Sequence, residues 1–418
     1  MTLCGMSSLI GMTLGEGITL SFRRSGFVLN AALLLWPCNL VNKRKHNLLF
    51  LSFVPEIGGA EISTLLLLEK MDRNIWNPVY VMPSEGPLSK RARALDVRVD
   101  TMQLEKITLP FPGRYMGTVW RLARFIRNNH IDLVACTVEI CNQYGLPAAR
   151  LNRIPIVCHT RNMIPDYRSF WRTLLHFPDL LIANSRATAE SYRGYLRRGQ
   201  KVVTIHNGVD LTEFAPMSNN NGFRKRYGIN RDDYLIGVIA RISPHKRQDL
   251  FITAMVEVVR VCPNAKAVIV GETFIDRSAD YMEKLRRMVT DYGLEKRIIF
   301  TGFVENMREL YAALDMLVLP STAEPFGRVL IEAMAMELPI VATRSGGAVE
   351  IVDDEKTGRL VNPDDPVKLA DAIKTLYGAP LSCAVMGKAG RERVELLFSI
   401  EKNIEKTQAA YLSVLGNV

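Results

Sequence analysis

With 418 residues, the chain is too long for one ordinary hydrophobic core, so two domains are expected. Its hydrophobic content of 48% excludes a disordered protein and favours a mostly buried α/β fold. The net charge of +10 is concentrated in residues 1–210, which hold 26 Lys and Arg against 15 Asp and Glu. This half is expected to face an anionic partner, such as a bilayer, a phosphorylated acceptor or nucleic acid; a cationic surface that serves only solubility is the alternative.

The seven cysteines are odd in number, and no pair has the spacing of a zinc site or a redox motif. Most of them lie within apolar runs, which favours buried free thiols in a reducing compartment. We therefore predict a cytoplasmic protein, and the basic first half adds peripheral contact with the inner face of the membrane as a hypothesis.

Residues 1–46 are predicted to be an extension outside the domains. Arg23 and Arg24 precede an apolar stretch, Gly26–Trp36, in the order of a signal sequence. The stretch is short for a spanning helix, and no clear small-residue cleavage site follows it. Two interpretations stay open, a weak membrane anchor and a non-native segment from an over-long gene prediction.

From Asn47 onward, short apolar runs alternate with amphipathic segments, which indicates parallel sheets covered by helices on both faces. A first Rossmann-like domain is predicted over residues 47–215, with strands at 48–54, 79–82, 131–136, 154–159, 180–183 and 201–205.

The polar segment Pro216–Asn221 is the predicted linker. A second Rossmann-like domain follows over residues 216–395, with predicted strands at 235–240, 267–271, 298–301, 316–319 and 340–343. The predicted fold class is thus α/β, with two Rossmann-like domains facing each other across a cleft. Ligands of such sheets bind outside the carboxyl ends of the strands.

The densest chemical signal is the segment Glu324–Ala335, directly after the predicted strand 316–319. Pro325 suits the start of a helix, so the backbone amides of residues 326–328 would form an anion site. Glu324 and Glu332 could then hold two parts of one ligand. Two acids eight residues apart are more often solvated surface, but the surrounding Pro-Phe-Gly and the preceding strand favour a site.

Two further signals follow strands. Arg241 and Lys246 lie on a Pro-containing loop after the strand 235–240, where two cations could clamp a diphosphate. Gly58 and Gly59 follow the first strand, where glycine lets backbone approach a phosphate; a lone Gly-Gly turn is weak evidence. No metal-binding constellation stands out in the sequence.

Together, these motifs resemble glycosyltransferase family 4, a retaining family with the GT-B fold that uses nucleotide sugars. The resemblance runs from about Asn47 to the C-terminus. It rests on ordered motifs, which are Gly58–Glu61, His206–Asp210, Arg241 with Lys246, Gly302–Val304, Glu324–Glu332, and Gly346-Gly347 followed by Glu350.

The resemblance implies a role for each matching residue. Arg241 and Lys246 would hold the donor diphosphate, Glu324 would contact the transferred sugar, and Glu332 the ribose of the nucleotide. The remaining donor-side positions are Gly58 and Gly59 near the diphosphate, Val304 near the base, and Phe326, Gly327, Arg328 and Val329 in the loop and helix start. Residues 396–418 would form a helix that crosses back to the first domain.

The acceptor side departs from the family pattern. Relatives often carry a His followed by an acid after the strand equivalent to 154–159. Those positions align here with Arg161 and Asn162, or with His159 if the alignment shifts. These three residues are the acceptor-side candidates.

The predicted activity is transfer of a sugar from a UDP- or GDP-linked donor to a glycan or lipid-linked acceptor, in cell-surface polysaccharide or glycolipid synthesis. The protein would be a hexosyltransferase-type enzyme with no cofactor, no metal and no nucleic-acid partner. A nucleotide-sugar epimerase of the same architecture and a non-catalytic nucleotide-binding protein are the alternatives.

An anionic membrane surface is the remaining predicted partner. Residues 114–127 combine aromatic side chains with Arg121, Arg124 and Arg127 at spacings of three. This segment could dock on anionic lipid head groups, or it could be an ordinary amphipathic helix with a solvated basic face.

Overall fold

The computed structural model describes residues 44–104, 113–163, 178–217, 221–273 and 279–416. Residues 1–43, with nearly all of the predicted extension, lie outside the described part, as do residues 218–220 of the predicted linker. The chain from Lys45 onward forms one compact unit that contains two parallel sheets.

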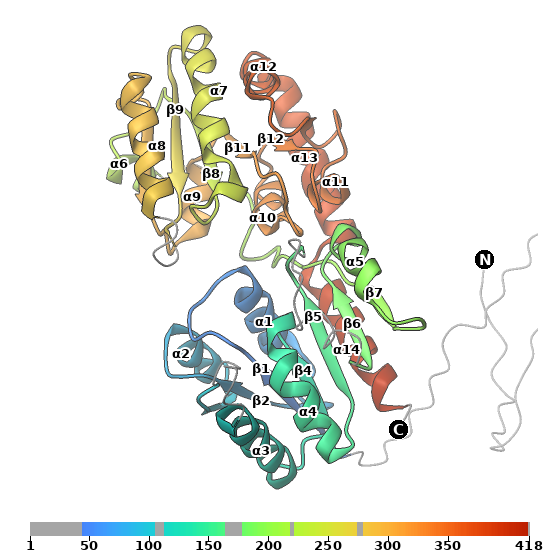
Figure 1. Ribbon diagram of the computed structural model, residues 1–418. Helices are drawn as coiled ribbons and strands as arrows, with labels where there is room; N and C mark the ends of the chain where they lie inside the picture. The colour runs from blue at the N-terminus through green and yellow to red at the C-terminus, as the bar shows by residue number, and fades with distance from the viewer. Residues whose placement is uncertain (1–43, 105–112, 164–177, 218–220, 274–278, 417–418) are drawn as a thin grey trace, which may run out of the picture. The chain divides into compact units, whose positions relative to one another are not determined.

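The first sheet has seven strands in the order β3-β2-β1-β4-β5-β6-β7, all paired in parallel (Figure 1). Its strands are β1 (His46–Leu51), β2 (Trp76–Met82), β3 (Arg98–Thr101), β4 (Leu133–Cys136), β5 (Ile156–Thr160), β6 (Leu180–Ala183) and β7 (Val202–Thr204). The helices between them are α1 (Gly59–Lys70), α2 (Pro87–Ala94), α3 (Gly113–Asn128), α4 (Asn142–Asn152) and α5 (Arg186–Tyr192).

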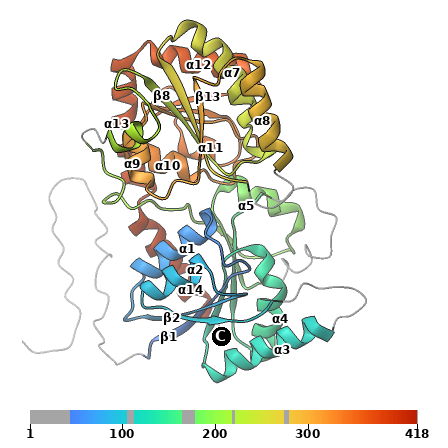
Figure 2. The same cartoon turned by 90° about the vertical axis from the view of Figure 1, so that its left-hand side faces the viewer.

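Both faces of the first sheet are buried because the apolar run of β1 alternates between them. Leu48 and Phe50 belong to one core cluster, and Leu49 and Leu51 belong to the other. Helices α1 and α2 contribute to the first cluster, whereas α3 and α4 cover the opposite face and lie side by side (Figures 1 and 2).

The second sheet has six strands in the order β10-β9-β8-β11-β12-β13. Its strands are β8 (Tyr234–Ile239), β9 (Ala265–Val270), β10 (Ile298–Gly302), β11 (Met316–Leu319), β12 (Ile340–Thr343) and β13 (Arg359–Val361). Its helices are α6 (Asn221–Arg226), α7 (Gln248–Val261), α8 (Ala279–Asp291), α9 (Met307–Ala313), α10 (Arg328–Ala335), α11 (Ala348–Ile351), α12 (Pro366–Tyr377) and α13 (Pro380–Leu397).

In the second sheet, Met316 and Val318 of β11 pack in one core cluster, and Leu317 and Leu319 pack in the other. The six strands repeat the order of the first six strands of the first sheet, with β8 in the place of β1. The two parallel α/β sheets confirm the predicted fold class.

The last helix, α14 (Ile400–Leu415), packs with the first sheet although it follows the second one in sequence (Figure 1). Ile400, Ile404, Tyr411 and Val414 all belong to the core cluster that also holds Leu48 and Phe50. The start of α14 is also held to the first domain, because the Val209 amide donates to the Phe398 carbonyl and the Ile400 amide donates to the Val209 carbonyl.

Several sequence expectations differ from the structure at the edges of elements. Strands β3 and β13 were not predicted, because both are short edge strands with charged and half-exposed residues. The first strand ends at Leu51 rather than at residue 54, and α6 already begins at Asn221, the last residue of the predicted linker.

The predicted free thiols are confirmed for the five cysteines within the described residues. Cys136, Cys141, Cys158 and Cys262 are buried, and Cys383 is partly buried. Cys4 and Cys38 lie outside the described residues. Among the described helices, none is long and apolar enough to cross a bilayer.

Candidate functional site

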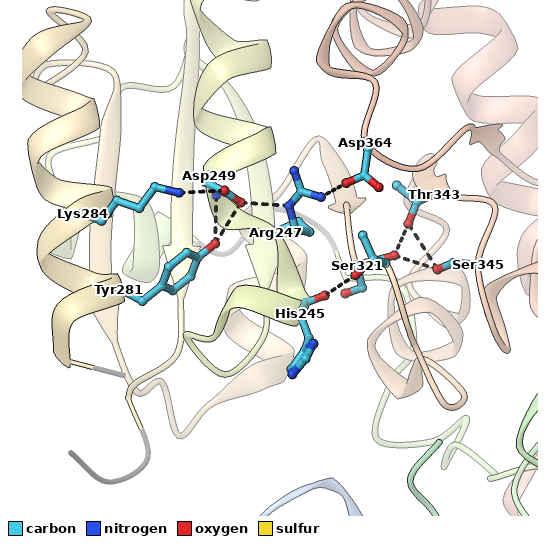
Figure 3. A network of polar contacts seen from close by, with 10 residues as sticks. His245, Arg247, Asp249, Tyr281, Lys284, Ser321, Thr343, Ser345 and Asp364 are labelled. Atoms are coloured by element: carbon cyan, nitrogen blue, oxygen red, sulfur yellow. Dashed lines mark hydrogen bonds and ion pairs between the residues drawn. The ribbon is translucent and has the colours of Figure 1, made fainter. Parts of the chain in front are cut away.

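The candidate site lies at the carboxyl edge of the second sheet, where two neighbouring strands each lead into a loop. Strand β8 pairs with β11, so the loop 240–247 lies beside the loop 320–327. The two are joined by a hydrogen bond from the Thr322 amide to the His245 carbonyl, 3.1 Å long (Figure 3). This edge is where the strand order of the sheet places a ligand.

Both loops are held by contacts with other residues of the second domain. The Ser321 carbonyl accepts hydrogen bonds from the hydroxyls of Thr343 and Ser345, at the end of β12. Arg247, with a left-handed φ of 51°, ion-pairs with Asp249 and Asp364 (Figure 3). These contacts hold the loops in place without using the residues predicted to bind a ligand.

The central pair of the site is Lys246 and Glu324, whose Nζ and Oε2 atoms lie 2.6 Å apart. Lys246 ends a short 3₁₀ turn, η4 (Pro244–Lys246), and Glu324 lies on the facing loop. The two side chains are 23% and 10% exposed, so solvent reaches the pair but does not surround it. The structure thus brings together two of the predicted catalytic residues, and Arg241 lies exposed on the same loop as Lys246.

The helix after Glu324 starts later than predicted. Helix α10 begins at Arg328, and Gly327 before it has a φ of 100°, so the expectation that Pro325 opens the helix is wrong. A residue with that φ cannot be part of an α-helix, and a side chain there would be strained. Glu332 consequently lies about one turn inside the helix. The first amides of α10 still lack partners within the helix and point toward its N-terminal end.

Glu332 is held by two neighbours. Arg328, one turn earlier, lies with Nη2 2.8 Å from Oε1, and the Tyr311 hydroxyl donates to Oε2 at 2.9 Å. Burial and the adjacent carboxylate raise the pKa of Tyr311 well above its usual range, so its hydroxyl keeps its proton. Glu332 is therefore a fixed carboxylate at the end of the site nearer the body of α10.

Arg328 also reaches the first domain. Its Nη1 donates to the Ser63 hydroxyl at 3.1 Å, and its Cδ lies 3.8 Å from where a Cβ on Gly59 would be. Gly59 is the first residue of α1, and Gly58 precedes it with its amide donating to the Glu61 carboxylate at 3.0 Å. The Gly-Gly turn therefore lies beside α10, as a phosphate-binding role would require, but the Gly58 amide already has a partner.

Of the three acceptor-side candidates, His159 is the most enclosed. It is 6% exposed, and its Nε2 lies 2.7 Å from the Tyr411 hydroxyl of α14. Burial, assisted by the charge of Arg161, lowers the pKa of His159 well below its usual value. Asn162 is exposed, and its side-chain amide donates to Glu139 at 2.6 Å.

Arg161 directly follows β5 and contacts residues that follow two other strands of the first sheet. Its Nε donates to the Thr137 carbonyl and its Nη1 to the Asn207 side chain, both at 3.2 Å. Together with His159, it lines a cavity with room for about one water molecule. Arg161 therefore has polar contacts within the first domain that the sequence did not indicate.

The remaining predicted donor residues lie mainly in the core. Phe326 is buried and stacks on His206 at 5.7 Å between ring centres, and Val304 is buried in the same core cluster. Val329 is partly buried against that cluster. Their side chains therefore fix the shape of the site. Within the described residues, no group of His, Cys, Asp or Glu side chains has the arrangement of a metal site.

Sequence reasoning missed four side chains around the site, Ser63, Tyr311, Ser185 and Thr188. The first two contact Arg328 and Glu332, and the last two donate hydrogen bonds to the carbonyl of Pro325. The one available signal was the position of Ser185 before a helical segment, which is typical of an N-cap. That pattern could not reveal the second partner across the fold.

Comparison with known proteins places this geometry in context. The model "Glycosyltransferase Family 4" matches residues 57–213, and "Glycosyl transferases group 1" matches residues 219–393. The chain is 31% identical over 371 residues to the GDP-mannose-dependent monoacylated alpha-(1-6)-phosphatidylinositol monomannoside mannosyltransferase of Corynebacterium glutamicum, covering 84% of this chain and 93% of that protein.

A second mannosyltransferase and a solved structure are also similar to this chain. The GDP-mannose-dependent alpha-(1-6)-phosphatidylinositol monomannoside mannosyltransferase of Mycolicibacterium smegmatis is 32% identical over 240 residues, which is 55% of this chain and 61% of that protein. The crystal structure of Anabaena HepE in complex with UDP and glucose superposes with a TM-score of 0.78 at 25% identity, covering 88% of this chain and 99% of that one.

Proposed function

The chain belongs to glycosyltransferase family 4, and from that premise we propose that it transfers a hexose from a nucleoside-diphosphate sugar to a lipid-linked glycan, with retention at the anomeric carbon. GDP-mannose is the first candidate donor, because the two curated relatives are named for it. UDP-glucose is the second, because HepE binds UDP and glucose.

The Lys246–Glu324 pair is the observation that carries this proposal. Breaking a sugar–phosphate bond leaves negative charge on the diphosphate and positive charge at the anomeric carbon. Lys246 and the first amides of α10 supply positive potential for the former. Glu324 supplies negative potential and hydrogen-bond acceptors for the sugar, 2.6 Å from the lysine. Preorganised groups of this kind contribute about 10²–10³ in rate each.

The same pair favours a route without a covalent intermediate. A carboxylate that is ion-paired with a lysine is a weak nucleophile, so Glu324 is better suited to bind sugar hydroxyls than to attack carbon. In the proposed front-face route, the leaving phosphate accepts the proton of the attacking acceptor hydroxyl. Glu332, held by Arg328 and Tyr311, offers its carboxylate to the ribose hydroxyls.

A lipid-linked acceptor requires access to a membrane, and α3 has the surface for it. Met116 and Trp120, one turn apart, are 57% and 64% exposed, and Arg124 follows one further turn along the same face. No acidic residue occurs in α3. Exposed Trp suits the boundary between head groups and acyl chains, and arginine attracts anionic lipid.

Release of nucleoside diphosphate from a panel of donors tests the proposal. The purified protein is incubated with GDP-mannose, UDP-glucose and UDP-N-acetylglucosamine, with and without a glycolipid-containing membrane extract. We expect release from one donor, faster with extract, and formation of a glycosylated lipid. Because Lys246 and the α10 amides take the charge of the leaving group, EDTA should leave the rate unchanged. Conversion of the donor to an isomeric nucleotide sugar, without release, would instead support an epimerase.

A further inference from the structure

The first turn of α5 is joined to the second domain by a set of contacts that the proposed chemistry does not use. We call this set the α5 clasp, formed by Ser185, Thr188, Glu350 and His206. Ser185 is the N-cap of α5, and its hydroxyl oxygen accepts from the Thr188 amide at 2.9 Å. The amides of Arg186 and Ala187 have no partner within the helix, as at any helix start.

Glu350 supplies the missing partners from the other domain. Its two carboxylate oxygens accept the Arg186 amide at 3.0 Å and the Ala187 amide at 2.9 Å. Glu350 belongs to α11, whose last carbonyls are bound by Arg393 of α13. A carboxylate at a helix N-terminus is well placed, because both the amides and the helix dipole favour negative charge.

The clasp also forms hydrogen bonds with the loop that carries Glu324. The Ser185 and Thr188 hydroxyls donate to the carbonyl of Pro325, the residue after Glu324. On its other side, His206 lies with Nε2 2.9 Å from the Glu350 carboxylate while its ring stacks on Phe326. Pro325 and Phe326, which follow Glu324 directly, are therefore both held by residues of the first domain.

The Gly346-Gly347 turn, in the second domain, is in close backbone contact with the same loop. The Gly347 amide donates to the Glu324 carbonyl at 2.8 Å. A Cβ on Gly346, whose φ is +49°, would lie 2.0 Å from that carbonyl oxygen, and a Cβ on Gly347 would lie 2.5 Å from the Cα of Phe326. The turn leads directly into α11, so Glu350 and the support of Glu324 belong to one short rigid segment.

We propose that Glu350 is a positioning residue for glycosyl transfer. By tying α11 to α5, it fixes the loop 324–327, and with it the Glu324 carboxylate, relative to the first domain, where the acceptor is expected to bind. The inference rests on the proposed role of Glu324. Glu350 lies on α11, outside the loops that carry Lys246 and Glu324, so its loss should leave nucleotide binding intact while slowing transfer. A displacement of about 1 Å at a reacting group can cost on the order of 10²-fold in rate.

Three variants separate positioning from stability. Glu350→Ala removes all the contacts of the carboxylate, and Glu350→Gln keeps one oxygen acceptor. Asp354→Ala is the matched control, because Asp354 binds Arg344 and the Leu360 amide entirely within the second domain. The binding of GDP and UDP is measured by calorimetry, and release of nucleoside diphosphate is measured from GDP-mannose and UDP-glucose.

We expect Glu350→Ala to bind GDP or UDP within about threefold of the wild type and to turn over about 10- to 100-fold more slowly. Glu350→Gln should lie between the two, and Asp354→Ala should keep the wild-type rate. Wild-type turnover in Glu350→Ala would overturn the inference, as would loss of nucleotide binding, which would mean that Glu350 maintains the donor domain.

Amide hydrogen exchange tests the clasp without any substrate. In Glu350→Ala, the amides of residues 186–187 and 326–328 should exchange faster, whereas Asp354→Ala should leave them unchanged. Unchanged exchange in Glu350→Ala would overturn the inference. If the wild type releases no nucleotide from any donor but exchange responds as expected, the proposed function fails and the clasp remains as a structural link.

Discussion

Lys246 and Glu324 neutralise each other across 2.6 Å, and this mutual contact makes their separate removal informative. Glu324→Ala takes away a competitor for the lysine, so free GDP or UDP should bind as tightly as to the wild type or more tightly. Lys246→Ala removes positive charge from the diphosphate position, so both nucleotides should bind more weakly. Each variant should lose about 10²–10³ in turnover.

Calorimetry with GDP and UDP, and the rate of nucleoside-diphosphate release, distinguish the two variants. Lys356→Ala is the control, because Lys356 forms an exposed ion pair with Asp353 away from these loops. Near-wild-type turnover in either site variant would remove that residue from the mechanism. A weaker affinity of Glu324→Ala for free nucleotide would show that the carboxylate supports the diphosphate site instead of the sugar.

Buried His159 makes stability depend on pH. Its folded-state pKa lies well below the value near 6.5 of the unfolded chain, so below that pH the unfolded state binds a proton that the folded state does not. Stability should therefore be complete above pH 7 and fall as the pH drops through 6.5, with a loss from this residue that is limited to about 1.4 kcal/mol at pH 5.5 by the unfolded-state pKa.

Urea unfolding at pH 7.5 and 5.5 measures this loss. His159→Phe should reduce the difference between the two pH values by about that amount. It should also be less stable at both values, because Tyr411 loses its hydrogen-bond partner. His130→Asn is the control, because His130 is exposed with a φ of 48° that Asn tolerates. An unchanged difference in His159→Phe would mean that the pKa of the histidine is the same in the folded and the unfolded protein.

At the scale of elements, α3 carries the expected attraction to membranes. Replacing Arg121, Arg124 and Arg127 together by Gln should weaken binding to anionic vesicles by one to two orders of magnitude, since each basic residue near the surface contributes about 1 kcal/mol. Trp120→Ala should weaken it further, and salt should weaken binding of the wild type. Sedimentation with vesicles of phosphatidylglycerol and of phosphatidylcholine measures both effects.

A control with the same loss of charge separates α3 from the general basicity of the domain. Replacing Arg197, Arg198 and Lys201 by Gln also removes three positive charges from exposed positions of the first domain. This variant should keep most of its vesicle binding. Equal losses in the two triple variants would indicate a diffuse electrostatic attraction, and α3 would then be an ordinary covering helix with a solvated basic face.

The elements that the sequence predicted best are those buried on both faces. The bounds of β6, β11 and β12 agree with the structure to the residue, because uninterrupted apolar runs end where polar loops begin. Edge strands β3 and β13 gave no such signal. The start of α10 was misplaced because Pro325 is compatible with a helix start, whereas the left-handed Gly327 that decides the matter depends on the packing of the whole loop.

The candidate site shows the same division. Motif order indicated Lys246 and Glu324, since each follows a predicted strand by a few residues, and it indicated Glu332 in the helical segment that comes next. The other side chains around the site could not be predicted, because Ser63, Tyr311 and Ser185 are common in type and contact the site only across the fold. Long-range contacts such as the α5 clasp depend on how two domains and α14 come together, and local patterns carry no information about that.

At the scale of the whole molecule, the two sheets share one strand order over six strands, and the end of the chain packs on the first sheet. Helix α14 follows the second domain and fills the core of the first, beside β1 and Trp76. The Val209 backbone bonds to Phe398 and Ile400 place the outgoing and returning chain segments side by side. The first domain therefore completes its core only after the last helix has been made, so the two domains fold as dependent parts.

The N-terminal boundary of this molecule gives the last prediction. The compact unit begins at Lys45, and β1 begins at His46 with its backbone already paired to β2. Deleting residues 1–43 should therefore leave the melting temperature within about 2 °C and the rate of nucleoside-diphosphate release unchanged. Deleting residues 1–51 is the control, because it removes β1, an interior strand of the first sheet that pairs with both β2 and β4, and should abolish folding. Circular dichroism melts and the donor assay compare the three proteins.

Loss of folded protein on removal of residues 1–43 alone would show that the segment packs on the domain. A selective loss of vesicle binding would instead assign the membrane contact to this segment and not to α3.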